Sequence, residues 1–192
     1  MPDTTDSQLT RQLERNSMRK FALVTGATSG IGRAFAERLA ADGYDLVIAG
    51  RRRERLEAFA DSHPDVEVRI VPSDLATGAG IDTVTEICAT EPLTMLVNNA
   101  GVAHYMPLAE LPADQARELV NVKVLAPTML TRAVVAGMQE RGEGTIINVA
   151  GMIAFSGPAP HSAAPPRRLR GNSGLPRRDV PGPQRRARGY GS

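Results

Sequence analysis

The sequence predicts an α/β fold in which helices cover both faces of a parallel sheet. Short apolar runs alternate with segments that carry apolar residues at helical spacing, from about residue 20 to residue 149 of the 192-residue chain. Strands that alternate with helices run parallel, and parallel strands buried on both faces are apolar throughout. No internal repeat of fixed period interrupts the alternation. We expect one folded domain over residues 18–157.

The first half of this domain contains two strand and helix pairs. Residues 20–25 are predicted to form the first strand. Apolar residues then recur at helical spacing from Ile31 until Gly43, which supplies a stop. Residues 46–49 form a second buried strand, and a helix follows over about residues 53–60.

The second half continues the same order of elements. Residues 66–71 alternate as a third strand, and residues 81–89 have the pattern of a short helix. A fourth strand is expected over residues 93–98. A long helix over about residues 113–139 then leads into a fifth strand at residues 145–149.

A glycine-rich turn joins the first strand to the first helix. Its glycines have the spacing Gly-x-x-x-Gly-x-Gly. Glycines let backbone N–H groups approach a pyrophosphate closely, and the N-terminus of the helix offers unpaired N–H groups and the positive end of its dipole. We therefore predict that the turn binds the pyrophosphate of a dinucleotide. The residues predicted to take part are Gly26, Thr28, Ser29, Gly30, Ile31 and Gly32.

The end of the second strand indicates which dinucleotide is bound. A carboxylate there would bind the 2′-hydroxyl of an adenosine ribose, but the position is Gly50 and two arginines follow it. A guanidinium group suits the 2′-phosphate of NADP. We predict that Arg51, and second to it Arg52, binds this phosphate, so that NADP(H) is favoured over NAD(H). The alternative is that these arginines are solvated charges at the start of a helix.

Further motifs occur in the order of a known family. They are Asp74-Leu75 after the third strand, Asn98-Asn99-Ala100-Gly101 after the fourth, Asn121 in the long helix, and residues 144–149. Together with the glycine-rich turn they resemble the short-chain dehydrogenase/reductase family over about residues 19–157. The resemblance implies a Rossmann-like, doubly wound parallel sheet with the strand order 3-2-1-4-5.

The resemblance also implies roles for these residues. Asp74 would contact the adenine, and Asn121 would belong to a proton-relay tetrad as the catalytic residue. The other residues that it implies for cofactor binding are Leu75, Asn98, Ala100 and Gly101. The implied reaction is hydride transfer between NADP(H) and a small alcohol or carbonyl substrate.

The chain departs from the catalytic pattern of this family. Gly151, which has no hydroxyl, stands where a polarising serine is expected. After Gly157 there is neither a helical period nor a Tyr-x-x-x-Lys motif. We expect the final strands and the catalytic helix to be missing and the chain to be inactive as an oxidoreductase. The alternative is a nucleotide-binding pseudoenzyme with a regulatory surface.

The two ends of the chain differ in composition from the domain. Residues 161–192 carry a net charge of +7, the remainder carries −5, and seven of the 14 prolines lie from Pro158 onward. We expect residues 1–17 to be a disordered leader and residues 158–192 a disordered tail. Arginine, proline and glycine clusters are typical of GC-rich DNA read out of frame, so we interpret the tail as a frameshift. The alternative is a genuine tail that binds nucleic acid or another acidic partner, although Tyr190 is its one stacking aromatic residue.

The remaining composition bears on location and partners. The single cysteine, Cys88, cannot form an internal disulfide, and no histidines have metal-ligand spacing. The first residues are polar, and no apolar run approaches the length of a membrane span. We expect a cytoplasmic protein without membrane contact. The resemblance implies homo-oligomers for intact relatives, through a face that this chain is expected to lack.

Overall fold

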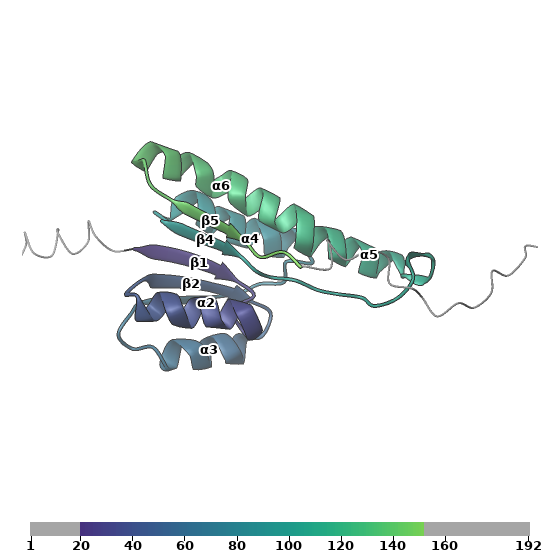
Figure 1. Cartoon of the computed structure of the whole chain (residues 1–192), viewed down its shortest axis with the longest axis horizontal. Coiled ribbons are helices and arrows are strands. Elements are labelled where there is room, and N and C mark those ends of the chain that lie inside the picture. The colour runs from purple at the N-terminus through teal and green to yellow at the C-terminus, as the bar shows by residue number, and fades with distance from the viewer. Residues whose placement is uncertain (1–19, 152–192) are drawn as a thin grey trace, which may run out of the picture. The chain divides into compact units, whose positions relative to one another are not determined.

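The computed structural model describes residues 20–151, which form a five-stranded sheet with helices on both faces (Figure 1). The strand order is β3-β2-β1-β4-β5, which confirms the predicted order 3-2-1-4-5, and all neighbouring strands are parallel. The strands are β1 (Phe21–Thr25), β2 (Asp45–Gly50), β3 (Val68–Pro72), β4 (Met95–Asn98) and β5 (Thr145–Asn148).

Helices connect each strand to the next. They are α2 (Gly30–Ala41), α3 (Arg53–Asp61), α4 (Gly78–Thr90), the 3₁₀ turn η1 (Leu108–Glu110), α5 (Ala113–Val120), the π-helical turn η2 (Asn121–Leu125) and α6 (Ala126–Arg141). In Figure 1, α2 and α3 lie on one side of the sheet, and α4 and α6 lie on the other. This arrangement is the doubly wound fold that the sequence predicts.

Two apolar layers form the core, one on each face of the sheet. Because side chains alternate along a strand, residues of paired positions form rows on one face. The α2 and α3 face has the row Ile48, Val24, Val97 and Ile147 across four strands. The first three side chains are fully buried, whereas Ile147 in β5 is half-buried. The sheet is therefore better covered at β1 and β2 than at β5.

The expected elements are all present, with shifted boundaries. The third strand begins at Val68 instead of residue 66, and the fourth begins at Met95 instead of residue 93. Helix α4 is longer than expected at both ends, and Thr77 caps its first turn by accepting a hydrogen bond from Gly80 N at 3.1 Å. Local hydrogen bonds of this kind decide where a helix or strand ends. The spacing of the apolar residues gives no information about them.

The long helix contains one feature that the sequence analysis did not predict. Its backbone passes through the π-helical turn Asn121–Leu125 before continuing as α6. Pro127 explains this turn, because proline has no N–H and its ring clashes with the carbonyl four residues earlier, which belongs to Lys123. The Thr128 hydroxyl donates to the Val124 carbonyl at 2.7 Å. The widened turn therefore lies immediately before the proline that requires it.

The same helix corrects one expectation about membranes. The continuous helix from Ala113 to Arg141 spans 29 residues, and its most apolar window has a mean hydropathy of 1.4 and is 22% buried. By length and composition it is sufficient to cross a membrane, so the expectation that no such segment exists was wrong. A single helix of this kind is weak evidence for a span, because core helices meet the same criterion. In this fold Val122, Leu130 and Val134 of the helix are buried in the core.

Several predictions concern residues that lie outside the described part of the chain. The leader at residues 1–17, the tail at residues 158–192 and the two domain boundaries are among them. The region after Gly157, where the catalytic tyrosine and lysine were sought, is also outside it. These predictions stay predictions.

Candidate cofactor-binding site

A groove runs along the carboxyl ends of the strands, where β1 and β4 lie side by side. The chain turns from β1 toward β2 in one direction and reaches β4 in the other, so this is the switch point at which open α/β sheets bind ligands. Two cavities occupy the groove, with volumes of about 540 Å³ and about 990 Å³. Both are lined by the segment from Asn99 to Val102, together with Ile31, Leu75 and Val122. The two cavities therefore adjoin and form one site.

The glycine-rich turn forms one wall of the smaller cavity. Gly26 has a φ of +69°, and a Cβ there would lie 2.9 Å from both Ala100 Cα and Asn99 Nδ2. A Cβ on Gly32 would overlap the Asn99 side chain and the Gly26 carbonyl. Both positions need glycine because the turn, the first turn of α2 and the end of β4 pack backbone against backbone. The packing leaves the N-terminus of α2 directed at the groove.

A threonine at the end of β1 connects the turn to β4. The Thr25 hydroxyl accepts hydrogen bonds from the backbone N–H groups of Asn99, at 3.0 Å, and Ala100, at 3.1 Å. Asn99 Nδ2 in turn donates to the Thr25 carbonyl at 3.1 Å. These contacts fix the position of the segment after β4 relative to the glycine-rich turn. The sequence analysis gave Thr25 no role of its own, although it stands at the end of the first strand, directly before the glycine-rich turn.

Arg52 reaches back over the glycine-rich turn. Its Nη2 donates to Thr28 Oγ1 at 2.7 Å and to Ser29 Oγ at 3.0 Å, and all three residues line the smaller cavity. Ser29 precedes α2 as its N-cap residue, but its hydroxyl makes no capping hydrogen bond to that helix. Gly50 also lines this cavity. A guanidinium group and two hydroxyls therefore converge at one end of the groove.

Arg51 points to a different partner. Its Nη1 lies 3.7 Å from Glu118 Oε1 on α5, and the other carboxylate oxygen of Glu118 lies 2.9 Å from His104 Nε2. The Arg51 side chain is 61% exposed, so this long pair contributes little to stability. Both predicted arginines line the smaller cavity, but Arg52 contacts the glycine-rich turn whereas Arg51 lies near Glu118 of α5.

The other residues predicted for cofactor binding lie along the groove. Asp74 lines the smaller cavity, and its Oδ1 accepts from Ala76 N at 3.0 Å, which orients the carboxylate. Ile31 lines both cavities and remains 60% exposed, which is unusual for an isoleucine beside a folded core. Leu75, Ala100 and Gly101 line both cavities as well. An exposed apolar side chain in a groove is suited to packing against a ligand.

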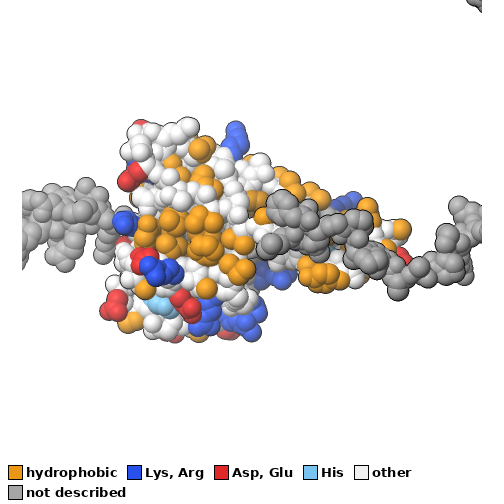
Figure 2. Space-filling view, viewed as in Figure 1, with side chains coloured by type: hydrophobic (Ala, Val, Ile, Leu, Met, Phe, Trp, Pro, Cys, Tyr) orange, Lys and Arg blue, Asp and Glu red, His pale blue; other side chains and the backbone are white. Residues whose placement is uncertain are grey.

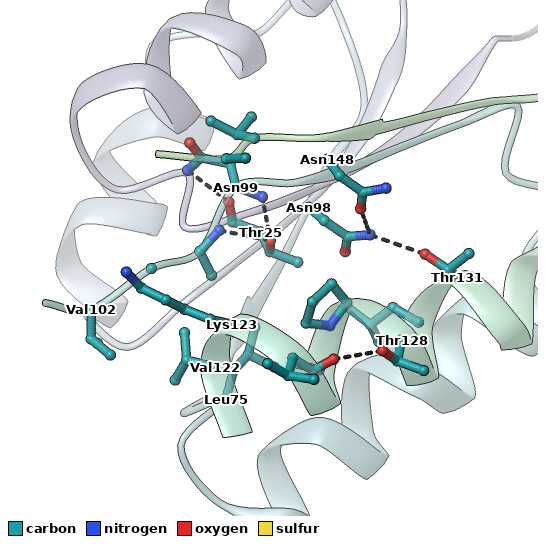
Figure 3. Close-up of a pocket in the computed structure, with 18 of the residues that line it drawn as sticks. Thr25, Leu75, Asn98, Asn99, Val102, Val122, Lys123, Thr128, Thr131 and Asn148 are labelled. Atoms are coloured by element: carbon teal, nitrogen blue, oxygen red, sulfur yellow. Dashed lines mark hydrogen bonds between the residues drawn. The ribbon is translucent and has the colours of Figure 1, made fainter. Parts of the chain in front are cut away.

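Asn98 lines the larger cavity and joins three elements (Figure 3). Its Nδ2 donates to Thr131 Oγ1 on α6 at 3.2 Å and to Asn148 Oδ1 on β5 at 2.9 Å. Its Oδ1 is buried and has no hydrogen-bond partner among residues 20–151. A buried amide oxygen is costly without a partner, so this one can accept a hydrogen bond from a water, a ligand or a residue outside 20–151.

Asn121 and Lys123 lie differently with respect to the groove. Asn121 Nδ2 donates to the Ala76 carbonyl at 2.6 Å, and Asn121 lines neither cavity. Lys123, two residues later in the π-helical turn, lines the larger cavity. The catalytic role that the resemblance implies for Asn121 stays a prediction. Gly151 also lines the larger cavity and brings no hydroxyl to it.

The single cysteine, Cys88, is buried and lines neither cavity. Burial raises the pKa of the Cys88 thiol from 9.0 to about 12, so at neutral pH it is protonated and unreactive. Among residues 20–151 no group of three His, Cys, Asp or Glu side chains is placed to hold a metal ion. The arrangement can bind a long ligand that is anionic at one end and less polar at the other.

Known proteins share both the sequence pattern and the fold. The sequence profile described as short chain dehydrogenase matches residues 20–164. Inactive hydroxysteroid dehydrogenase-like protein 1 of Pongo abelii is 34% identical over 136 residues, which cover 68% of this chain and 41% of that protein. The chain thus spans well under two thirds of this relative.

Solved structures give the same result. A short-chain dehydrogenase from Sphingobium yanoikuyae in complex with NADPH superimposes with a TM-score of 0.69 at 33% identity, covering 71% of this chain and 56% of that one. L-Sorbose reductase from Gluconobacter frateurii, complexed with NADPH and L-sorbose, gives a TM-score of 0.65 at 35% identity, with coverages of 71% and 54%. The fold, the groove and these likenesses agree, and the chain belongs to the short-chain dehydrogenase family of NAD(P)-binding oxidoreductases.

Proposed function

We propose that this chain binds NADP(H) in the groove and favours it over NAD(H). The observation that carries the proposal is the contact of Arg52 with the hydroxyls of Thr28 and Ser29 at the end of β2. A guanidinium group held beside two hydroxyls suits a phosphate monoester, whereas Gly50 offers no carboxylate for a ribose 2′-hydroxyl. Two structurally similar proteins are NADPH complexes, which supports the same choice.

The residues present fit a dinucleotide along the whole groove. In the proposal, Gly26, Gly30 and Gly32 hold the pyrophosphate against the N-terminus of α2, and Arg52 binds the 2′-phosphate, with Arg51 beside it. Asp74 and Leu75 flank the adenine. Ile31, Asn98, Ala100 and Gly101 line the way to the nicotinamide end. When bound, this cofactor supplies or accepts a hydride.

We further propose that the parent reaction is hydride transfer between NADP(H) and an alcohol or carbonyl substrate, and that this chain does not perform it. Gly151 supplies no hydroxyl to the larger cavity, and Asn121, the residue proposed for the proton relay, bonds to Ala76 away from it. The chain also spans only 41% of a curated relative that is itself named inactive. A nucleotide-binding protein without turnover fits these observations.

The test is a titration of the full chain with NADPH and with NADH. The chain has no tryptophan that could transfer energy to the cofactor, so binding is followed by the reduced nicotinamide's own fluorescence. We expect saturable binding of NADPH, with NADH about tenfold weaker, and no oxidation of bound NADPH by a panel of ketones and aldehydes. Equal affinity for the two cofactors would refute the preference, and carbonyl reduction would refute the inactivity.

An arginine variant locates the site. Arg52→Gln removes the guanidinium charge and is expected to weaken NADPH about tenfold while NADH is unchanged, because only NADPH carries the 2′-phosphate. Arg38→Gln is the matched control, since Arg38 is exposed on α2 and pairs with Asp42 away from both cavities. If both variants bind NADPH equally well, Arg52 is not the phosphate ligand.

A further inference from the structure

We propose that the larger cavity binds a ligand with an apolar body and one carboxylate, and that Lys123 binds the carboxylate. The proposal rests on the proposed function in one respect, since it takes the larger cavity as the substrate end of the groove. It adds the chemical class of that ligand and a binding residue that the family resemblance does not supply.

Among residues 20–151, the charged side chains that line the larger cavity are all cationic. Lys123 and Arg132 line it, and no aspartate or glutamate of this part of the chain does. Lys123 has no ion pair with any carboxylate among residues 20–151. The acidic residue beside the groove, Asp74, lines only the smaller cavity. A ligand with a negative group therefore finds an available ammonium here and no carboxylate to repel it.

The backbone explains why Lys123 faces the cavity. Pro127 cannot donate to the Lys123 carbonyl, and the helix widens into the π-helical turn at this point. Such turns are frequent at functional sites because they redirect side chains. Figure 3 shows the Lys123 side chain extending from the helix across the cavity, with its nitrogen on the side of Val102. Asn121, two residues earlier, is tied to Ala76 instead.

The rest of the lining is largely apolar. The apolar side chains that line it include Leu75, Val102, Val122, Leu130 and Val149. Burying an apolar body against them contributes roughly 25 cal/mol for each Å² removed from water. The hydroxyl and amide side chains that line it are those of Thr25, Asn98, Asn99, Thr128, Thr131 and Asn148. Asn98 Nδ2 donates to Thr131 Oγ1, and the Thr128 hydroxyl donates to the Val124 carbonyl. Cationic side chains at an apolar cavity, Lys123 and Arg132, suit a carboxylate on a hydrocarbon body.

The chain offers an internal control for this proposal. It contains two lysines, Lys20 and Lys123. Lys20 Nζ lies 5.4 Å from the centre of the Tyr44 ring, at the start of β1 and therefore at the opposite edge of the sheet. Reductive methylation with ¹³C-formaldehyde keeps both charges and gives each lysine its own NMR signal, besides that of the α-amino group.

The experiment titrates the methylated full chain with octanoate and with its neutral analogue, octanamide. We expect octanoate to shift the Lys123 signal saturably and to leave the Lys20 signal in place. Octanamide should bind about tenfold more weakly, since it keeps the apolar body and loses the charge. Lys123→Met, which keeps most of the unbranched side chain and removes its charge, should lower octanoate affinity by about tenfold, and Lys20→Met should not.

Two results would overturn the proposal. One is octanamide binding as tightly as octanoate, and the other is a Lys123 signal that does not move. A failure of the proposed function can be told apart from a failure of this proposal, because cofactor binding is measured separately, with NADPH. If NADPH binds and octanoate leaves Lys123 unaffected, the carboxylate site is refuted and the cofactor site stands.

Discussion

The two halves of the sheet are covered to different extents. At β1, β2 and β3, helices α2 and α3 close one face, while α4 and α6 close the other side of the sheet. In β4 and β5, on the face of the sheet that α2 packs against, Val97 is buried. Met95, Ile147 and Val149 on this face are only half-buried. Figure 2 shows apolar side chains gathered on the surface near the β4 and β5 side of the molecule.

The two ends of the groove also differ in how many of their polar groups are held in place. The smaller cavity has a glycine cradle, an arginine held by two hydroxyls, and an oriented aspartate. The larger cavity has an unpartnered Asn98 oxygen and, at Gly151, no hydroxyl. The described part of the chain is therefore more complete as a cofactor site than as a catalytic site, in keeping with its coverage of 41% to 60% of its curated relatives.

The largest expected contrast is in core stability. Ile48 and Ile147 lie in one row on the same face, at β2 and β5. Ile48→Ala is expected to lower the free energy of unfolding by about 3–4 kcal/mol, because the side chain is fully buried. Ile147→Ala should cost only about 1 kcal/mol, because that side chain is already partly in water. Urea denaturation of both variants measures the difference, and equal costs would contradict the uneven coverage.

The glycine cradle gives the next largest effect. Gly32→Ala places a methyl group on the Gly26 carbonyl and the Asn99 side chain, so it is expected to cost about 2–3 kcal/mol and to weaken NADPH binding. Gly78→Ala is the matched control, because a Cβ there meets nothing within 4 Å. Thermal unfolding and NADPH titration of both variants test this. A Gly32→Ala protein with unchanged stability and affinity would show that the close packing is not required.

The smallest effect concerns the contact across the groove. Glu118→Gln removes the charge that holds Arg51 at 3.7 Å and is expected to raise NADPH affinity about twofold without changing NADH affinity. The reason is that Arg51 is then available to the 2′-phosphate. Competitive titration of the two cofactors measures the ratio. A lower affinity for NADPH would indicate that Glu118 positions Arg51 for the phosphate instead of competing for it.

The sequence was sufficient to predict the order of the elements and the glycine-rich turn. Strand and helix periods differ, and the turn needs glycines at positions such as Gly26 and Gly32 that no other residue satisfies. The fold and the family are confirmed. These features depend on local patterns, which a single sequence carries directly.

Contacts across the groove could not be predicted in this way. Which of Arg51 and Arg52 is available to a 2′-phosphate depends on the position of Glu118. This residue lies 67 residues after Arg51 in the sequence. The position of Lys123 depends on the π-helical turn, for which Pro127 was an overlooked signal. Which residue faces a cavity after such a turn follows from tertiary packing rather than from spacing.

The most direct measurement of the central claim is calorimetric titration of the full chain with 2′,5′-ADP and with 5′-AMP. These fragments occupy the adenosine end of the groove without involving the larger cavity. A complete cofactor end predicts that 2′,5′-ADP binds and that 5′-AMP, which lacks the 2′-phosphate, binds at least about tenfold more weakly. Equal binding of the two fragments, or no binding of 2′,5′-ADP, would contradict the account.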